Sequence, residues 1–449
     1  MFQSLNASGT PLTAIETFRP SVVNTTELNH IRFENSDAKR DFAKIEELFK
    51  DMNSAAAKSK LTNEFLTSFA IVVDAYKLES HFSSQRKYLE RIYDKELSDY
   101  DSQCKFIRFF ANYSEFYKKV WTDYRGDNFL TIEKINTNGE AELVSVLMSF
   151  LKKSNHRMSI TLFGYFYNDI LEGKPESIAN FVNVVKTVSA FYILWRSAEA
   201  NAGLDNVYRN FFKGKDGETS VHTWISTKGK SIDIQELKTY FKNILADKKL
   251  DNKELWIKKA ASYLRYETGG NICRIALLIA SHDTIPDDLQ PGLMKMSTRD
   301  VAPYLKLEKW LSDNLKEIEH IAPKEANGNW NENLYDVNTN LYDSLGNLTF
   351  LPKSINISVS NREWTEKWLY YRHLAEKDPD KVSELAINAA NKGISLNPST
   401  IAMLQDASFN HHILPIIQIS DTQTWDAEIV EKRTHRMLAI VWDKITEWL

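Results

Sequence analysis

Apolar side chains recur every three or four residues over most of the first 285 positions, which is the period of an amphipathic helix. The segments 65–78 and 179–195 show this period. The clearest run follows Asp233, a residue suited to a helix N-cap, and consists of Ile234, Leu237, Phe241, Ile244 and Leu245. The pattern therefore predicts a mainly α chain.

Proline placement supports this prediction and suggests where the chain divides. Only Pro175 lies between Pro20 and Pro286, whereas eight prolines occur from Pro286 to Pro415. Because proline interrupts helix interiors, a stretch with so few prolines is compatible with a helical array. The turn-rich segment 281–292 then ends it. We expect a helical domain at 21–285, a linker at 286–303 and a further domain at 304–449.

The pattern in this last part is different. Two short apolar runs, 318–321 and 348–351, read as strands, and the polar, Asn-rich stretch 324–340 between them reads as a loop. Helical periods precede and follow them, at 304–315, at 364–375 and, as a terminal amphipathic helix, at 426–449. Strand, loop, strand and helix in this order are the elements of a ββα metal finger, here embedded in helices.

Composition and net charge limit the cell compartment and the binding partners that we expect for this protein. The formal net charge of −4 gives no overall basic field, so any contact with nucleic acid depends on local charge. Cys104 and Cys273 form neither a metal-type spacing nor a disulfide framework, which indicates a reducing compartment. The first residues lack a signal-peptide pattern, and apolar runs such as 275–280 are too short to span a bilayer. We expect a cytoplasmic protein without membrane contact.

Candidate chemistry concentrates between positions 319 and 356. Hydrolysis of a phosphodiester needs an activated water, a cation near the phosphate and help for the leaving oxygen. His320 suits a general base because imidazole titrates near neutral pH, and Asn347 could hold its ring. Glu319 and Asn356 offer the hard oxygen ligands that one Mg²⁺ or Mn²⁺ ion prefers.

The order Glu319-His320-Ile-x-Pro, then Gly-Asn347-Leu, then Asn356 resembles HNH nucleases of the His-Me finger group. With Trp330, Leu-Gly-Asn-Leu-Thr at 345–349, Asn361, Lys367 and a similar ending around Arg433, 300–449 resembles the nuclease domain of GmrSD-type modification-dependent restriction enzymes. The resemblance implies that His320 is the base, Asn347 orients it and Glu319 and Asn356 bind the cation. Asn361, Lys367 and Arg433 would contact the DNA backbone or support the site.

Two positions depart from the pattern of this group. The gap from His320 to Asn347 is 27 residues, longer than in compact HNH motifs, and Val359 stands where a lysine is usual. A second His-x-x-Pro at His412 has no asparagine after it and is read as structural.

The start of the chain carries a second resemblance. Gly9 and Pro11 form a turn, and Thr13 with Glu16 forms a capping box. Residues 1–20 resemble the last part of the ParB-like sensor/NTPase domain of the same proteins, whose Asp-Gly-Gln-Gln-Arg motif is absent here. We therefore expect residues 1–20 to be a remnant of that domain and expect no NTPase activity of the chain itself. The chain is then either a truncated or split form or one half of a two-gene system, in which a companion subunit carries the missing part.

Three functions fit the sequence. The first is a metal-dependent DNA endonuclease of a restriction or anti-phage system, with DNA as its partner. The second is a non-catalytic helical module, binding nucleic acid or protein, whose finger is degenerate. The third is a ribonuclease that uses the same chemistry, although the helical body lacks the basic-aromatic stripe typical of single-strand grooves.

Overall fold

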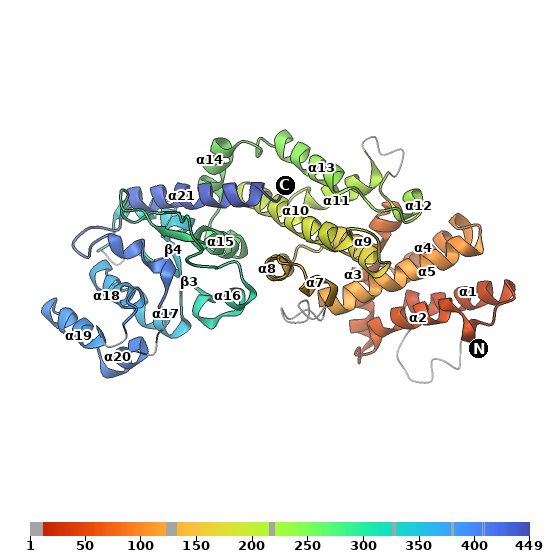
Figure 1. The fold of residues 1–449 in the computed structure, drawn as a ribbon, viewed down its shortest axis with the longest axis horizontal. Helices are drawn as coiled ribbons and strands as arrows, with labels where there is room; N and C mark the ends of the chain where they lie inside the picture. Colours follow the sequence, from red (N-terminus) through yellow and green to blue (C-terminus); the bar gives the residue numbers. More distant parts are fainter. Residues whose placement is uncertain are drawn as a thin grey trace. The chain divides into compact units, whose positions relative to one another are not determined.

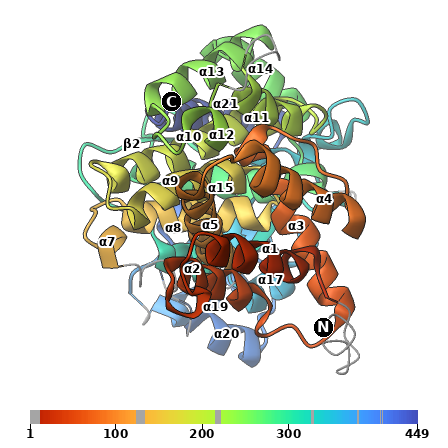
Figure 2. The ribbon, with the colours of Figure 1, turned by 90° about the vertical axis from the view of Figure 1, so that its right-hand side faces the viewer.

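The protein is described by a computed structural model that covers residues 12–122, 133–214, 221–325, 329–378, 381–405, 407 and 409–449. It is 66% helical with 3% strand, and helices dominate from both directions of view (Figures 1 and 2). The predicted fold class, mainly α, is therefore confirmed.

The chain forms two compact units. Unit 1 comprises Met1–Ala141, Asn155–Val188 and Ala202–Tyr240, and unit 2 comprises Glu142–Ser154, Ser189–Asn201 and Phe241–Leu449. This division by compactness does not test the boundaries expected at positions 20, 285 and 303, which stay predictions.

Unit 1 is built from helices packed through aromatic side chains. The rings of Phe65 and Phe69 on one helix stack on Phe110 of another, at centroid distances of 5.6 and 4.5 Å. Such aromatic pairs add specific geometry to the burial of apolar area. The helices are α1 (Ala14–Leu28), α2 (Asp37–Glu46), α3 (Ala55–Asp74), α4 (Phe82–Glu90), α5 (Tyr100–Glu115), α7 (Glu133–Asn136), α9 (Ser159–Leu171), α11 (Leu204–Lys213) and α12 (Trp224–Thr227).

Unit 2 contains two short antiparallel hairpins among its helices. The first pairs β1 (Thr284–Pro286) with β2 (Met294–Met296), and the second pairs β3 (Glu317–His320) with β4 (Leu348–Leu351). The helices are α8 (Ala141–Lys153), α14 (Lys253–Tyr263), α15 (Tyr266–Ser281), α16 (Leu307–Leu311), α17 (Lys353–Val359), α18 (Trp364–Leu374), α19 (Val382–Asn391), α20 (Pro398–Gln405) and α21 (Ala427–Thr446).

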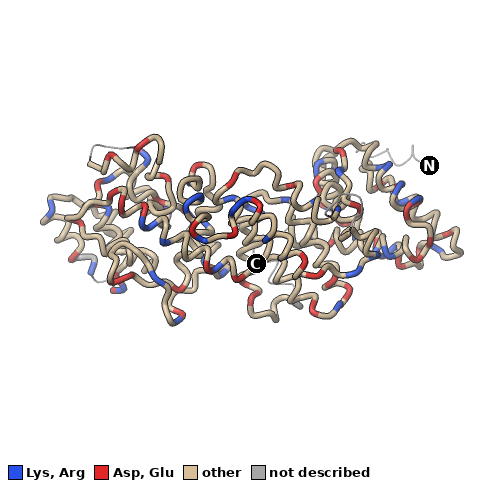
Figure 3. Tube along the Cα trace, turned by 90° about the horizontal axis from the view of Figure 1, so that it is seen from above, with Lys and Arg blue, Asp and Glu red and all other residues tan. Residues whose placement is uncertain are grey.

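The helices α10 (Ser177–Ala198) and α13 (Ile234–Asp247) contain residues of both units. By length and composition α10 alone among the described helices could cross a bilayer, yet 72% of its apolar window is buried in the structure. A buried apolar helix is typical of a protein core. Figure 3 shows acidic and basic residues interspersed along the trace, in keeping with the small net charge.

The predicted elements are recovered where the local pattern is strong. The strand expected at 348–351 is β4, that at 318–321 is β3 shifted by one residue, and the helix at 364–375 is α18. The capping box of Thr13 and Glu16 is present at the start of α1, whereas the preceding residues 1–11 lie outside the described chain. The helix expected at 304–315 is wrong in extent, because only α16 forms there and a 3-10 turn follows it.

Candidate active site

The second hairpin brings two of the predicted site residues to one pocket. His320 is the last residue of β3 and pairs with Leu348, while Glu319 pairs with Thr349. Neighbouring residues in a strand normally face opposite sides, but β3 ends at His320 and the chain turns away. A pocket of about 290 Å³ follows, lined by Glu319, His320, Pro323, Lys324, Glu325, Asn356, Ser360 and Asn361.

The ring of His320 is held by an aspartate that the sequence analysis did not single out. Nε2 of His320 lies 2.9 Å from Oδ1 of Asp343, and both side chains are buried. The backbone N–H of Glu267, in the first turn of α15, donates to Oδ2 of Asp343 at 2.9 Å. The Tyr266 ring packs edge-on against the imidazole, with centroids 5.3 Å apart. The imidazole is thus fixed in position and orientation.

The charge of Asp343 follows from these contacts. Burial acts to raise the pKa of this carboxyl group, but the hydrogen bonds from His320 and from the Glu267 N–H outweigh it and leave the pKa below its ordinary value. Asp343 is therefore ionised at neutral pH and accepts the proton of Nε2. With Nε2 as the donor, Nδ1 is the acceptor nitrogen of the neutral ring. Among the described residues, no group hydrogen-bonds to Nδ1.

Asn347 does not hold the His320 ring, and that expectation is wrong. Its side chain is fully buried, and Oδ1 accepts from the backbone N–H of Ala322 and from Nε1 of Trp425, each at 2.9 Å. Its Nδ2 donates to the carbonyl oxygens of Ala322, at 2.7 Å, and Tyr342, at 2.6 Å. The Asn347 amide therefore connects the start of the long loop between the strands, at Ala322, to a point near its end, at Tyr342. Tyr342 is the residue directly before Asp343.

Glu319 is tied to a buried lysine. The Lys367 side chain, fully buried on α18, donates to Oε1 of Glu319 at 2.5 Å and to the carbonyl oxygen of His320 at 3.0 Å. Burial raises the pKa of Glu319 and lowers that of Lys367, and the attraction between the two charges opposes both shifts. The pair holds the end of β3 against α18.

Arg433, like Lys367, is a buried cation that binds the second hairpin. Its guanidinium, on α21, is 1% exposed and donates to the carbonyl oxygens of Gly346 and Leu348 at 2.8 and 3.1 Å. Burial lowers its pKa to about 10. Neither Arg433 nor Lys367 can reach a DNA backbone, so of the two roles predicted for them only the supporting one fits. Asn361 is exposed at the pocket.

The remaining ligand candidate, Asn356, lies on α17, directly after β4. The helix ends at Ser360, whose φ of 41° lies in the left-handed region that favours glycine. This turn brings Ser360 and Asn361 to the same pocket as Asn356.

The donors at this pocket suit a cation with few protein ligands. Within the described ranges, no three His, Cys, Asp or Glu side chains gather as in a closed metal site. The lining residues include Glu319 and Asn356, whose side chains carry hard oxygen donors. Mg²⁺ commonly binds one or two such groups and keeps several water ligands. These donors therefore suit Mg²⁺ or Mn²⁺ better than a metal ion whose ligands all come from protein side chains.

Comparison with protein families matches residues 287–440 to the GmrSD restriction endonucleases, C-terminal domain. This part of the chain is a GmrSD C-terminal domain. No curated protein matches the chain. The GmrSD domain includes both strands of the second hairpin, α17, α18 and most of α21. It places this region among restriction endonucleases.

The second His-x-x-Pro of the GmrSD domain is structural, as predicted. His412 is buried, its Nδ1 lies 2.8 Å from the Tyr304 hydroxyl and its Nε2 lies 2.9 Å from the carbonyl oxygen of Phe350. Burial lowers its pKa to about 4, so the ring is neutral at physiological pH. Both nitrogens are occupied, which leaves none for proton transfer.

Proposed function

We propose that the chain is a divalent-metal-dependent DNA endonuclease of a restriction or anti-phage defence system, working in the cytoplasm. The observation that carries the proposal is the imidazole of His320, held by Asp343 at the edge of a pocket that Glu319 and Asn356 also line. The match of residues 287–440 to the GmrSD C-terminal domain supports the same activity.

In the proposed reaction, His320 is the general base. Asp343 keeps Nε2 protonated, so Nδ1 accepts a proton from the attacking water. As the imidazole becomes positively charged, the buried carboxylate of Asp343 stabilises it across the 2.9 Å contact. The two residues thus have the geometry of a base and the group that orients it.

Glu319 and Asn356 would hold the cation, Mg²⁺ or Mn²⁺. When bound there, the ion would supply positive charge beside the scissile phosphate and the leaving oxygen. Lys367 already binds Oε1 of Glu319, and a carboxylate has further lone pairs with which it can bind a cation. Asn356 contributes its amide oxygen from α17.

DNA would be held by local charge at the pocket. Lys324 is exposed on the pocket lining, and its Nζ lies 5.9 Å from the centroid of the Tyr266 ring that packs on His320. A lysine there can bind a phosphate oxygen next to the scissile bond, and Asn361 can donate a hydrogen bond to another. The companion subunit with a sensor/NTPase part stays a prediction from the sequence.

One observation favours the alternative function, a non-catalytic binding module. The Glu319 carboxylate already has a cationic partner in Lys367, so its charge is balanced without a metal ion. In that case the hairpin would only support the fold, and partners would bind in the presence of a chelator without being cut.

The test is nicking of supercoiled plasmid by the full chain, with Mg²⁺, with Mn²⁺ and with EDTA. We expect open-circular product with either metal and none with EDTA. Asn356→Ala should raise the metal concentration needed for half-maximal nicking, whereas the exposed Asn391→Ala is the matched control. Nicking that is equal with and without EDTA would contradict metal dependence. Cleavage of single-stranded RNA but not of DNA would favour the ribonuclease.

A further inference from the structure

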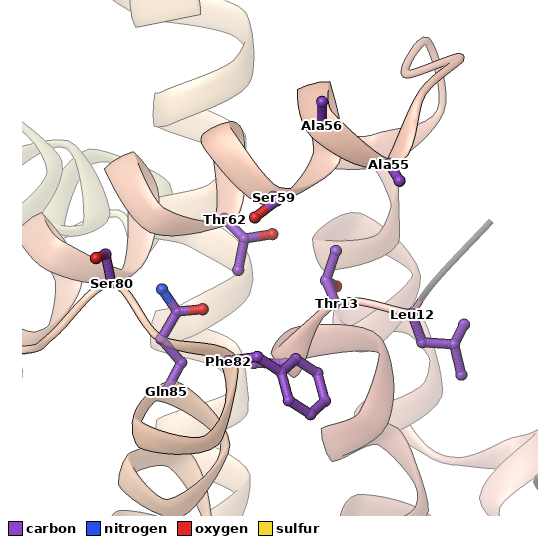
Figure 4. A pocket seen from close by; sticks show the side chains of 10 residues that line it. Leu12, Thr13, Ala55, Ala56, Ser59, Thr62, Ser80, Phe82 and Gln85 are labelled. Carbon is purple, nitrogen blue, oxygen red and sulfur yellow. The ribbon is translucent and has the colours of Figure 1, made fainter.

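Two described cavities outside the candidate active site differ in the charge of their linings. The cavity in unit 1 has a volume of about 560 Å³, and none of its described lining residues, whose side chains Figure 4 shows, is charged. The cavity in unit 2 has a volume of about 280 Å³ and lies at the end of α14, beside the loop between β3 and β4 and against α21. Its lining includes four ionisable side chains, those of Lys258, Arg265, Glu431 and His435. Of the two, the second cavity therefore has side chains that can bind or orient an ionised group.

Arg265 connects this cavity to the loop that carries Asp343. It is the N-cap residue of α15 and follows the end of α14 closely. Its Nη1 donates to the carbonyl oxygens of Ala261 and Leu264, at 2.9 and 2.8 Å. Its Nε and Nη2 donate to the carbonyl oxygen of Thr339, at 3.1 and 2.5 Å. One guanidinium group thus ties the end of α14 to the loop.

The loop runs from this anchor to Asp343 through a hydrogen-bonded turn. The backbone N–H groups of Thr339 and Asn340 both donate to the carbonyl oxygen of Asp336, at 3.0 and 2.7 Å. The backbone N–H of Asp343 donates to the carbonyl oxygen of Asn340 at 3.1 Å. Because the chain between Thr339 and Asp343 is held together in this way, a displacement of the first residue displaces the second.

The residues that follow Arg265 hold the same carboxylate and the imidazole directly. The Glu267 N–H donates to Oδ2 of Asp343, and the Tyr266 ring packs against His320. Burial lowers the pKa of Arg265, and the negative charge of Asp343 opposes this shift, so the two charges attract each other. The start of α15 therefore contacts every part of the pair formed by Asp343 and His320: the loop, the carboxylate and the ring.

We propose that Arg265 is a positioning residue for the general base. By tying Thr339 to the end of α14, it holds Asp343 against the imidazole of His320. This role rests on the proposed nuclease function. It extends the nuclease site beyond the GmrSD domain, because Arg265 lies before the matched residues 287–440. Lysine is not equivalent at this position, because its ammonium group lacks the planar fork of donors with which arginine reaches several carbonyl oxygens at once.

Plasmid nicking by the full chain at saturating Mg²⁺ tests this role, with Arg265→Gln and Arg265→Lys beside wild type. Both variants should nick at least about ten-fold more slowly, because a misplacement of about 1 Å can cost on the order of 100-fold in rate. Their affinity for a DNA duplex, measured in EDTA, should stay at the wild-type value. In the Asp343→Ala background, Arg265→Gln should change the rate by less than about two-fold, since the contact that it supports is already lost. A general loss of stability would instead slow both backgrounds alike.

The matched control is Lys258→Gln, which removes a positive charge from the same cavity. Lys258 is exposed, and its side chain makes no hydrogen bond or ion pair with the described residues. This variant should nick and bind DNA like wild type. Weaker DNA binding by both Lys258→Gln and Arg265→Gln would overturn the positioning role, because it would mean that the cavity binds a DNA phosphate instead.

Hydrogen exchange measures the anchoring without any cleavage. Exchange at the backbone amides of Asn340 and Asp343 should be faster in Arg265→Gln than in wild type, so the anchoring is tested even if the chain does not cut DNA. Unchanged exchange at these amides would overturn the role, as would nicking by Arg265→Gln at the wild-type rate or equal slowing in both backgrounds.

Discussion

The dependence of His320 on Asp343 gives the sharpest prediction. Asp343→Asn keeps the size of the side chain and removes its charge. The residue is 3% exposed and contacts His320 at 2.9 Å, so solvent screens this interaction little. A hydrogen bond to a charged group contributes about 1.5–3 kcal/mol, and losing it as the imidazolium forms should slow nicking roughly 10- to 150-fold.

The assay is the initial rate of plasmid nicking at saturating Mg²⁺, with circular dichroism to establish that the variant is folded. Asp336→Asn is the control, because Asp336 lies in the same loop but is exposed, and it should nick at the wild-type rate. A folded Asp343→Asn protein that nicks as fast as wild type would refute the idea that Asp343 positions the base.

The same substitution should change how stability depends on pH. The folded-state pKa of Asp343 is lowered from its ordinary 3.8, because the hydrogen bonds from His320 and the Glu267 N–H outweigh the effect of burial. Its ionised form therefore stabilises the fold above pH 3.8, and this contribution disappears as pH falls through the lowered pKa. Urea denaturation should show wild type more stable than Asp343→Asn at neutral pH, with the difference shrinking on acidification. A difference that does not change with pH would contradict this assignment.

Three further predictions concern the support of the hairpin. Asn347→Ala removes four buried hydrogen bonds and should destabilise the fold by at least about 3 kcal/mol in denaturant melts, whereas a purely catalytic role predicts normal stability. Lys367→Met leaves the buried Glu319 carboxylate without its cationic partner and should lower the free energy of unfolding by about 3–5 kcal/mol. Adding Glu319→Gln should recover most of this loss. Losses that simply add in the double variant would argue against the pair. Gly346→Ala places a methyl group 2.1 Å from the carbonyl oxygen of Val430 and should lower the melting temperature sharply or prevent folding, while a wild-type melting temperature would show that α21 can move away.

The sequence predicted elements whose signals are local. The apolar run at 348–351 and the helical period at 364–375 required no knowledge of distant contacts. The same holds for the capping box of Thr13 and Glu16, whose members lie one turn apart. The helix expected at 304–315 is shorter, because Tyr304 bonds through its backbone to Ala302 and to Nδ1 of His282 instead of entering a helix.

Side-chain roles within the site were less predictable. Asp343 stands 23 residues after His320, in a polar loop with other acids, and no spacing rule distinguishes it; only the fold brings the two together. The resemblance identified Asn347 as important but not its contacts, which are with the backbone of the loop and with Nε1 of Trp425. The burial of Lys367 and Arg433 likewise depends on tertiary contacts. From sequence alone, a lysine or arginine on a helix is expected to be exposed to solvent.

Plasmid nicking by His320→Ala, measured beside wild type in Mg²⁺ with and without added imidazole, decides whether His320 is the general base. The exposed His435→Ala serves as the control. If His320 is the base, the variant should lose at least about 100-fold in rate, within the range of general base catalysis, and free imidazole should restore part of it. A folded His320→Ala protein that nicks at the wild-type rate would contradict the account.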